Sequence, residues 1–333
     1  MLKVGLLGAG RIAGVHATAI AGHDGSQLVA VSDINDEAAA ALAKRSGAEA
    51  RDSEAILNDP EIDAVLIATS TDTHSDLMER ATAAGKAVLC EKPVDLSLDR
   101  ARQCLAAVQP TGMPVMIGFN RRFDPNFASL RRALNEGQIG DPEMLSIASF
   151  DPEPPPLDYV RISGGLYRDM MIHDFDMANF MMGAMPETVS AMGSCLVNPQ
   201  IGEAGDVDSA VVTMHYADGR IAVIRNSRRA AYGYDQRLEI LGSKGMLMVN
   251  NVLENTVVKA TDDGVSSAKP TYFFLQRYVA AFAAEWAAFA DALASDTPMP
   301  VTLEDGVSAL VLAEAATLSS RSGQPVRIDS LTS

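Results

Sequence analysis

A glycine-rich segment directly after a first apolar run constrains the fold of this chain more than any other feature. Residues 3–7 are strand-like, and Gly8-Ala9-Gly10-Arg11-Ile12-Ala13 follows them before a helical pattern begins. In this G-x-G-x-x-A motif, Gly8 permits a tight turn, Gly10 lets the backbone approach a pyrophosphate, and Ala13 lets helix and strand pack closely. The segment predicts a βαβ unit that binds a dinucleotide, with Arg11 and Ile12 at the helix start beside the phosphates.

The context that this motif requires follows in the sequence. Without it, a glycine-rich turn with no ligand would be an equally good interpretation. A second strand, residues 27–31, ends at Ser32-Asp33, about 20 residues after the motif, where an acidic residue contacts the ribose. Asp33 would accept hydrogen bonds from the ribose hydroxyls and repel a 2′-phosphate, and Ile34-Asn35 supply no arginine to accommodate one. The predicted cofactor is therefore NAD in preference to NADP.

The alternation of strands and helices continues to about residue 119. Helices are expected over residues 37–46 and 53–58, and apolar strands over residues 64–68, 87–90 and 115–119. Fully apolar strands in βαβ order indicate a parallel sheet covered on both faces.

Ligands of such sheets bind at the carboxyl ends of the strands. A histidine at a helix start is usually structural, and a lysine in a turn is usually a surface charge. Because His74 and Lys92 lie at strand ends, we nevertheless take both as candidates for cofactor binding. The candidates for cofactor binding at these ends are Ser70, Thr71, His74, Glu91 and Lys92.

The second half of the chain has a different pattern. One helix, residues 125–136, precedes a series of strands separated by turns such as Ala217-Asp218-Gly219, and two helices close the chain. The strands are expected over residues 143–150, 188–197, 207–216, 220–227, 236–242, 246–250 and 255–260, and the helices over residues 274–294 and 303–320. The predicted fold class is α/β: a Rossmann doubly wound parallel sheet in residues 1–119, then a C-terminal α+β domain with a large open, mainly antiparallel sheet in residues 120–333.

One stretch of the second half carries ionisable residues at helical spacing. The segment 164–176 is expected to be a glycine turn leading into one helix, with Asp169, His173 and Asp176 on the same face. A solvated polar face is the alternative interpretation, and this segment alone does not decide between the two.

Charge and composition limit the remaining function classes. The formal net charge of −16 disfavours nucleic acid as a partner, and no apolar run approaches the roughly 20 residues of a membrane span. The three cysteines, Cys90, Cys104 and Cys195, have neither a metal-ligand spacing nor a disulfide pattern. We therefore expect no metal, no membrane contact, and a cytoplasmic location, because residues 1–10 read as a strand rather than a signal peptide.

Three motifs together resemble those of the Gfo/Idh/MocA oxidoreductases: Gly8-Ala9-Gly10, Glu91-Lys92-Pro93 and Asp169-x-x-x-His173. The segments 118–125, 164–176 and 232–237 are most similar to the branch of that family that oxidises inositol. The resemblance implies a Rossmann domain, a mixed-sheet domain for substrate binding and oligomerisation, NAD, a lysine-aspartate-histidine catalytic set, and a homotetramer joined through open sheet faces. Phe150 departs from the pattern, because related enzymes often place a basic or polar side chain there.

The hypothesis that follows is the oxidation of a cyclic polyol, myo-inositol, to 2-keto-myo-inositol by hydride transfer to NAD. His173 is the expected general base, oriented by Asp169, and Lys92 would donate to the reacting oxygen. The residues expected to bind other hydroxyls of the substrate are Asp176 and Tyr234, with Asn120, Arg122 and Asp151 as weaker candidates.

Three alternatives remain open. The same reaction could act on scyllo-inositol or an aldose, or a transient oxidation could serve a hydrolase or isomerase. A catalytically silent dinucleotide-binding regulator is the third, although it would have no need for Lys92, Asp169 and His173 together.

Overall fold

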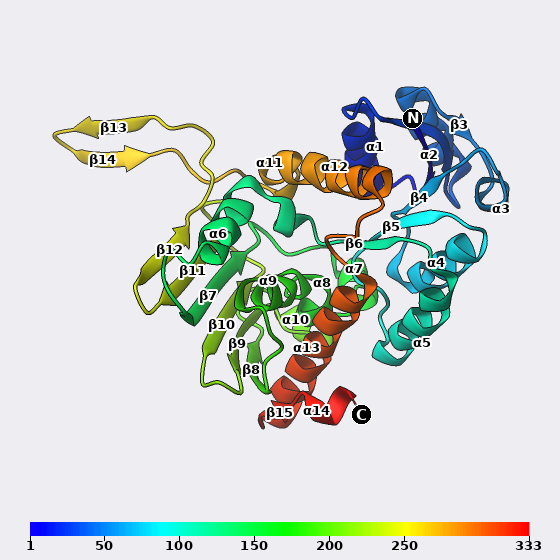
Figure 1. The fold of residues 1–333 in the computed structure, drawn as a ribbon. Helices are drawn as coiled ribbons and strands as arrows, with labels where there is room; N and C mark the ends of the chain where they lie inside the picture. Colours follow the sequence, from blue (N-terminus) through cyan, green and yellow to red (C-terminus); the bar gives the residue numbers. More distant parts are fainter. Residues whose placement is uncertain (333) are drawn as a thin grey trace. The chain divides into compact units, whose positions relative to one another are not determined.

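The chain forms two compact units in the computed structural model, which describes residues 1–332 (Figure 1). Unit 1 consists of Met1–Asp124 and Val279–Leu310, and unit 2 of Pro125–Tyr278 and the chain from Val311 onward. Unit 1 is therefore discontinuous in sequence, since a late segment joins the fold that begins at the N-terminus.

Unit 1 is built on a six-stranded sheet in the order β3-β2-β1-β4-β5-β6. All five pairs of neighbouring strands are parallel. The strands are β1 (Leu2–Leu7), β2 (Ser26–Ser32), β3 (Glu49–Ala50), β4 (Ala64–Ile67), β5 (Ala87–Glu91) and β6 (Val115–Gly118). The direction of strand progression reverses between β1 and β4, and doubly wound sheets bind ligands in the crevice outside the strand ends at that point.

The helices of unit 1 begin and end where the sequence supplies caps. The Asn35 side chain accepts the Ala38 N–H to start α2, and Gly47 ends that helix with φ of 68°.

Late in the chain, α12 packs against α1, and the Trp286 indole N–H donates to Ser26 Oγ over 3.1 Å. The helices are α1 (Arg11–Ala21), α2 (Asp36–Ser46), α3 (Ser53–Leu57), α4 (His74–Ala83), α5 (Leu98–Val108) and α12 (Val279–Ser295), with short 3₁₀ turns η1 (Thr71–Thr73), η2 (Gln109–Thr111) and η3 (Asn120–Phe123).

Unit 2 contains a seven-stranded sheet in the order β12-β11-β7-β10-β9-β8-β15. Only β7 and β10 run parallel; the other neighbouring strands are antiparallel. The strands are β7 (Pro142–Phe150), β8 (Thr188–Ser194), β9 (Ser209–His215), β10 (Ile221–Ser227), β11 (Asp235–Gly242), β12 (Gly245–Val249) and β15 (Val326–Arg327). Burial alternates along β9, so one face of the sheet is covered and the other is open.

Helices of unit 2 cover one face of this sheet, with α9 against β7 and α6 against β12. The strand expected over residues 255–260 is part of a separate hairpin, β13 (Val258–Thr261) with β14 (Gly264–Ser267), which extends away from the sheet in Figure 1. The helix expected over residues 274–294 is divided into α11 (Phe274–Arg277) and α12. The other helices are α6 (Pro125–Asn135), α7 (Leu157–Ile162), α8 (Leu166–Asp169), α9 (Ile172–Met182), α10 (Pro199–Glu203), α13 (Leu303–Ser322), which spans the boundary of the units, and α14 (Asp329–Thr332).

Candidate active site

The glycine turn after β1 has the shape of a pyrophosphate site. Gly8 has φ of +106°, and a Cβ there would lie 2.3 Å from the Ala68 carbonyl oxygen, so only glycine fits. A Cβ at Gly10 would meet no atom within 4 Å, which leaves open space beside the backbone. Helix α1 starts at Arg11 without a side-chain cap and without an acidic residue in its first turn. Its N-terminal N–H groups and helix dipole are therefore suited to an anionic phosphate.

Asp33 lies at the end of β2, beside this turn. Its Oδ2 accepts the Ala9 N–H over 2.6 Å, and its Oδ1 accepts the Asn35 N–H over 2.8 Å. These bonds fix the carboxylate against the glycine turn while leaving the side chain half-exposed. The residues present thus fit a dinucleotide, and the contact of Asp33 with the ribose hydroxyls stays a prediction.

His74 is the first residue of α4 and is buried. Its Nδ1 lies 2.8 Å from the Pro93 carbonyl oxygen and its Nε2 3.3 Å from that of Thr69. Burial lowers the pKa of this imidazole below its ordinary value, with the two backbone contacts opposing the shift. His74 therefore links the loops after β4 and β5, and its predicted role toward the cofactor would act through them. Ser70 and Thr71 lie in the first of these loops, at η1.

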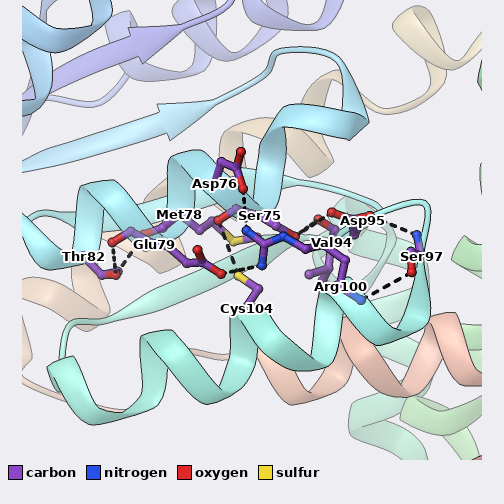
Figure 2. Close-up of polar contacts among 10 residues, drawn as sticks. All are labelled: Ser75, Asp76, Met78, Glu79, Thr82, Val94, Asp95, Ser97, Arg100 and Cys104. Carbon is purple, nitrogen blue, oxygen red and sulfur yellow. Dashed lines mark hydrogen bonds and ion pairs between the residues drawn. The ribbon is translucent and has the colours of Figure 1, made fainter.

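The loop that carries Lys92 is held on both sides. Before it, the Glu91 carboxylate points into unit 1, with Oε1 2.7 Å from His16 Nε2. After the cis Lys92–Pro93 peptide, the Ser75 hydroxyl donates to Asp95 Oδ2 over 2.8 Å (Figure 2). The same figure shows Arg100 of α5 paired with two carboxylates of α4, which fixes the two helices flanking this loop. Lys92 itself is half-buried at the carboxyl end of β5.

Asn120 and Arg122 lie in η3, at the end of unit 1's central sheet. Asn120 is buried. Arg122 pairs with Asp305 over 3.1 Å and donates to the Pro300 carbonyl oxygen over 3.4 Å. These contacts hold η3 to a later segment of the same unit, and a contact of Arg122 with substrate stays a prediction.

The helix expected to carry the ionisable face is two helices. Asp169 is the last residue of α8, whereas His173 and Asp176 belong to α9. Between them, the Met171 N–H donates to the carbonyl oxygen of Leu166, five residues back, so the turn is wider than an α-helical turn. The expectation of one continuous helix was therefore wrong, because the register of a regular helix does not extend across this break.

Asp169 is held by two side chains from other elements of unit 2. The Tyr159 hydroxyl of α7 donates to Oδ1 over 2.8 Å, and Arg228 donates to Oδ2 over 2.8 Å. Arg228 is buried and also pairs with Asp151 over 3.2 Å. Burial would lower the pKa of Arg228, but the charges of Asp169 and Asp151 outweigh it and raise the pKa. The two predicted carboxylates are thus joined by one buried arginine.

His173 is half-buried in the first turn of α9, and Asp176 is buried one turn later. The intervening Asp174 fixes the helix to the sheet, because it accepts the Ser149 hydroxyl over 2.6 Å and the Asn226 amide over 2.8 Å. These partners lie on β7 and β10. The position of His173 is therefore set by a buried hydrogen-bond network rather than by helix packing alone.

Tyr234 is buried just before β11. Its ring lies edge-on to Tyr278, with centroids 6.0 Å apart and an interplanar angle of 90°. The preceding Gly233 has φ of +128°, and a Cβ there would lie 2.8 Å from the Pro270 carbonyl oxygen. Phe150, the residue that departs from the expected pattern, is half-buried at the end of β7.

Two family models match the chain along most of its length. Residues 2–119 match the NAD-binding Rossmann fold of the Gfo/Idh/MocA oxidoreductase family, and residues 131–328 match its C-terminal alpha/beta domain. The chain belongs to the Gfo/Idh/MocA oxidoreductase family.

Known Gfo/Idh/MocA proteins resemble this chain over almost its full length. "Inositol 2-dehydrogenase" of Rhizobium meliloti is 48% identical over 315 residues, which is 95% of this chain and 96% of that protein. The crystal structure of a putative myo-inositol dehydrogenase from Sinorhizobium meliloti 1021 superposes with a TM-score of 0.96 at 47% identity, covering 98% of this chain and 100% of that one. The scyllo-inositol dehydrogenase from Lactobacillus casei, solved with NAD(H) and scyllo-inositol, superposes with a TM-score of 0.91 at 28% identity, covering 99% of this chain and 99% of that one.

Membership of the Gfo/Idh/MocA family confirms several predictions from the sequence. The α/β fold with a Rossmann sheet and a second, mainly antiparallel sheet is confirmed, as are NAD as the cofactor and an NAD-dependent dehydrogenase as the kind of enzyme.

Among residues 1–332, no helix has the length and apolar character needed to cross a membrane. In the same range, no group of histidine, cysteine or acidic residues is arranged to hold a metal ion.

Sequence reasoning missed the partners of the candidate site residues in unit 2. The sequence pattern assigns no role to Arg228, Tyr159 or Asp174. The available signal was the excess of carboxylates near residues 151–176, because buried carboxylates require cationic or hydrogen-bonding partners. Nothing in the sequence indicated which arginine would supply the charge.

Proposed function

We propose that this protein oxidises a secondary hydroxyl of a cyclic polyol, myo-inositol, to the ketone, with NAD as hydride acceptor. The observation that carries the proposal is the Asp169 carboxylate, which Arg228 and Tyr159 hold directly before the helix that carries His173. A carboxylate held close in sequence to a histidine supports the assignment of that histidine as the base that removes a hydroxyl proton. The names of the similar proteins supply the substrate class.

His173 acts in this proposal as the general base for the hydroxyl proton. The negative charge of Asp169 stabilises the imidazolium that forms, since an opposite charge favours the charged form of a titrating group. Arg228 and Tyr159 keep Asp169 in one orientation, so the carboxylate needs no rearrangement during the reaction.

Lys92 donates to the reacting oxygen and stabilises negative charge as the proton leaves. Its loop is fixed by Glu91 on one side and by His74 on the other. Bound NAD supplies the acceptor for the hydride. The remaining hydroxyls of the ring are bound by Asp176 and Tyr234, with Asn120, Arg122 and Asp151 as further candidates.

The substrate can be tested directly. Purified protein is incubated with NAD and a panel of myo-inositol, scyllo-inositol and aldoses while NADH absorbance is followed. We expect the highest kcat/KM with myo-inositol. Absence of NADH with every compound would contradict the proposal, and a clear preference for scyllo-inositol, the ligand in the Lactobacillus casei structure, would favour that isomer.

We further propose that the active form is a cytoplasmic homotetramer joined through the open face of the unit 2 sheet. Ile221, Met144, Leu241 and Met246 are exposed and occupy paired positions on the neighbouring strands β10, β7, β11 and β12. Residues paired in this way point to one face of a sheet. A row of exposed apolar side chains on a flat surface is typical of a protein–protein interface.

A further inference from the structure

Three ionisable side chains are buried inside unit 1, and the reaction proposed above assigns none of them a chemical step. His16 comes from α1, Glu91 from the end of β5, and Glu285 from α12. Their exposed fractions are 0%, 8% and 0%. Buried ionisable groups are unfavourable unless partners replace water, so their partners show what holds them.

His16 and Glu91 form a fixed pair. His16 Nε2 lies 2.7 Å from Glu91 Oε1, and the Phe282 ring lies edge-on to the imidazole, with centroids 5.4 Å apart at 82°. Burial would raise the pKa of Glu91, but the hydrogen bond and charge of His16, with Lys92 and His74, outweigh it and lower that pKa. Glu91 is therefore ionised at neutral pH.

The second oxygen of Glu91 faces the reactive lysine. Glu91 Oε2 accepts the backbone N–H of Lys92 over 3.3 Å. The pair thus connects helix α1 with the backbone of Lys92 through a single carboxylate. A lysine side chain is long and flexible, so the position of its ammonium group depends on how firmly its backbone is held.

Glu285 is fully buried in α12, the helix that packs against α1. Among residues 1–332, neither of its carboxyl oxygens has a hydrogen-bond partner. Burial and then the negative charge of Glu91 raise the pKa of Glu285 well above its ordinary value. The neutral acid is the form that avoids two repelling charges in the same interior.

We propose that Glu91, held by His16, is a positioning residue for Lys92, and that Glu285 completes the cluster as a neutral carboxylic acid. This inference rests on the role of Lys92 in the proposed function and extends it to the groups that place that lysine. A displacement of a reacting group by about 1 Å can cost about a hundredfold in rate, so a loosened Lys92 backbone should reduce turnover.

The test is a double-mutant cycle with Glu91→Gln and Lys92→Ala. Glu91→Gln keeps the size of the side chain and removes the charge that holds His16. We expect it to lower kcat at least about tenfold, with the Kd for NAD and the KM for substrate changed less than about threefold. Asp291→Asn, at an exposed position of α12, is the matched control and should retain wild-type kcat.

In the Lys92→Ala background, Glu91→Gln should cause no further loss, because its effect acts through Lys92. If the two substitutions instead lower kcat independently, so that their fold-losses multiply in the double variant, the inference is overturned and the proposed function is left intact. Wild-type turnover of Lys92→Ala alone would overturn both. If Glu91→Gln does not fold, His16→Asn breaks the same pair from α1 and replaces it in the cycle.

The protonation of Glu285 has a spectroscopic test. The infrared spectrum of the wild-type protein at neutral pH should contain the carbonyl band of a protonated carboxylic acid. Glu285→Gln should remove that band. A wild-type spectrum without it, or an unchanged band in the variant, would overturn the assignment of Glu285 as a neutral acid.

Discussion

At the scale of single residues, the two units supply complementary chemistry. The residues proposed for the cofactor and the cation, Gly10, Asp33 and Lys92, belong to unit 1, and the proposed Asp169 and His173 belong to unit 2. Substitutions at Lys92 and His173 are expected to change catalysis, and substitutions at Asp33 are expected to change cofactor choice.

Lys92→Ala and His173→Ala should each lower kcat by about a hundredfold to ten-thousandfold, the usual contribution of a positioned acid or base. The reason is the loss of the cation for the alkoxide in one case and of the base in the other. Steady-state kinetics with myo-inositol measures the loss, and NAD titration by fluorescence checks that the cofactor still binds. Near wild-type turnover in both variants would show that the catalytic assignment is wrong.

Asp33→Ser should weaken NAD binding by about tenfold to a hundredfold and improve use of NADP. The variant loses a charged acceptor for the ribose hydroxyls, worth roughly 1.5–3 kcal/mol, and the repulsion of a 2′-phosphate. The ratio of kcat/KM for the two cofactors is the measurement. An unchanged ratio would mean that Asp33 does not contact the ribose.

At the scale of elements, buried carboxylates fix loops and helices in unit 2. Asp208, between α10 and β9, accepts the backbone N–H groups of Leu196, Val197 and Asn198. Burial would raise the pKa of Asp208, but these bonds outweigh it and lower the pKa. Asp174 likewise holds α9 in place, by accepting hydrogen bonds from the Ser149 and Asn226 side chains.

The lowered pKa of Asp208 predicts a pH dependence of stability. A carboxyl with a lower pKa in the folded state adds stability above its unfolded pKa of about 3.9, and this is lost as pH falls through the folded pKa. Asp208→Asn should therefore destabilise the protein by about 2 kcal/mol at pH 7 and by less under acidic conditions. Urea unfolding at several pH values measures the difference. A penalty independent of pH would argue against an ionised Asp208.

The sequence predicted the elements whose signals are local. The glycine turn, Asp33, and the alternation of buried strands depend on neighbours along the chain, so they could be read directly. The break between Asp169 and His173 could not, because a wide turn at Met171 has no pattern of its own. The pairing of Arg228 with Asp169 joins residues 59 positions apart, and only folding brings them together.

At the scale of the whole molecule, the open sheet face of unit 2 predicts that copies of this chain associate through it. Leu241→Glu should place a charge in the exposed apolar row and convert the proposed tetramer to smaller species. Analytical ultracentrifugation measures the change, and Asp291→Asn, at an exposed position of α12 in unit 1, is the control. An unchanged sedimentation coefficient would exclude this face as the interface.

The discontinuous course of unit 1 also has a consequence for synthesis of the chain. Phe282 contacts His16 and Trp286 contacts Ser26, both in the N-terminal part of unit 1. Phe282 and Trp286 are nevertheless translated after Tyr278, when most of unit 2 has already been synthesised. Because domains generally fold as units during translation, we expect residues 1–124 to remain incompletely folded on the ribosome, with α1 not yet covered by α12. Ribosome-bound chains stalled near residue 278 should therefore recruit chaperones at this surface, and release from them should coincide with emergence of α12.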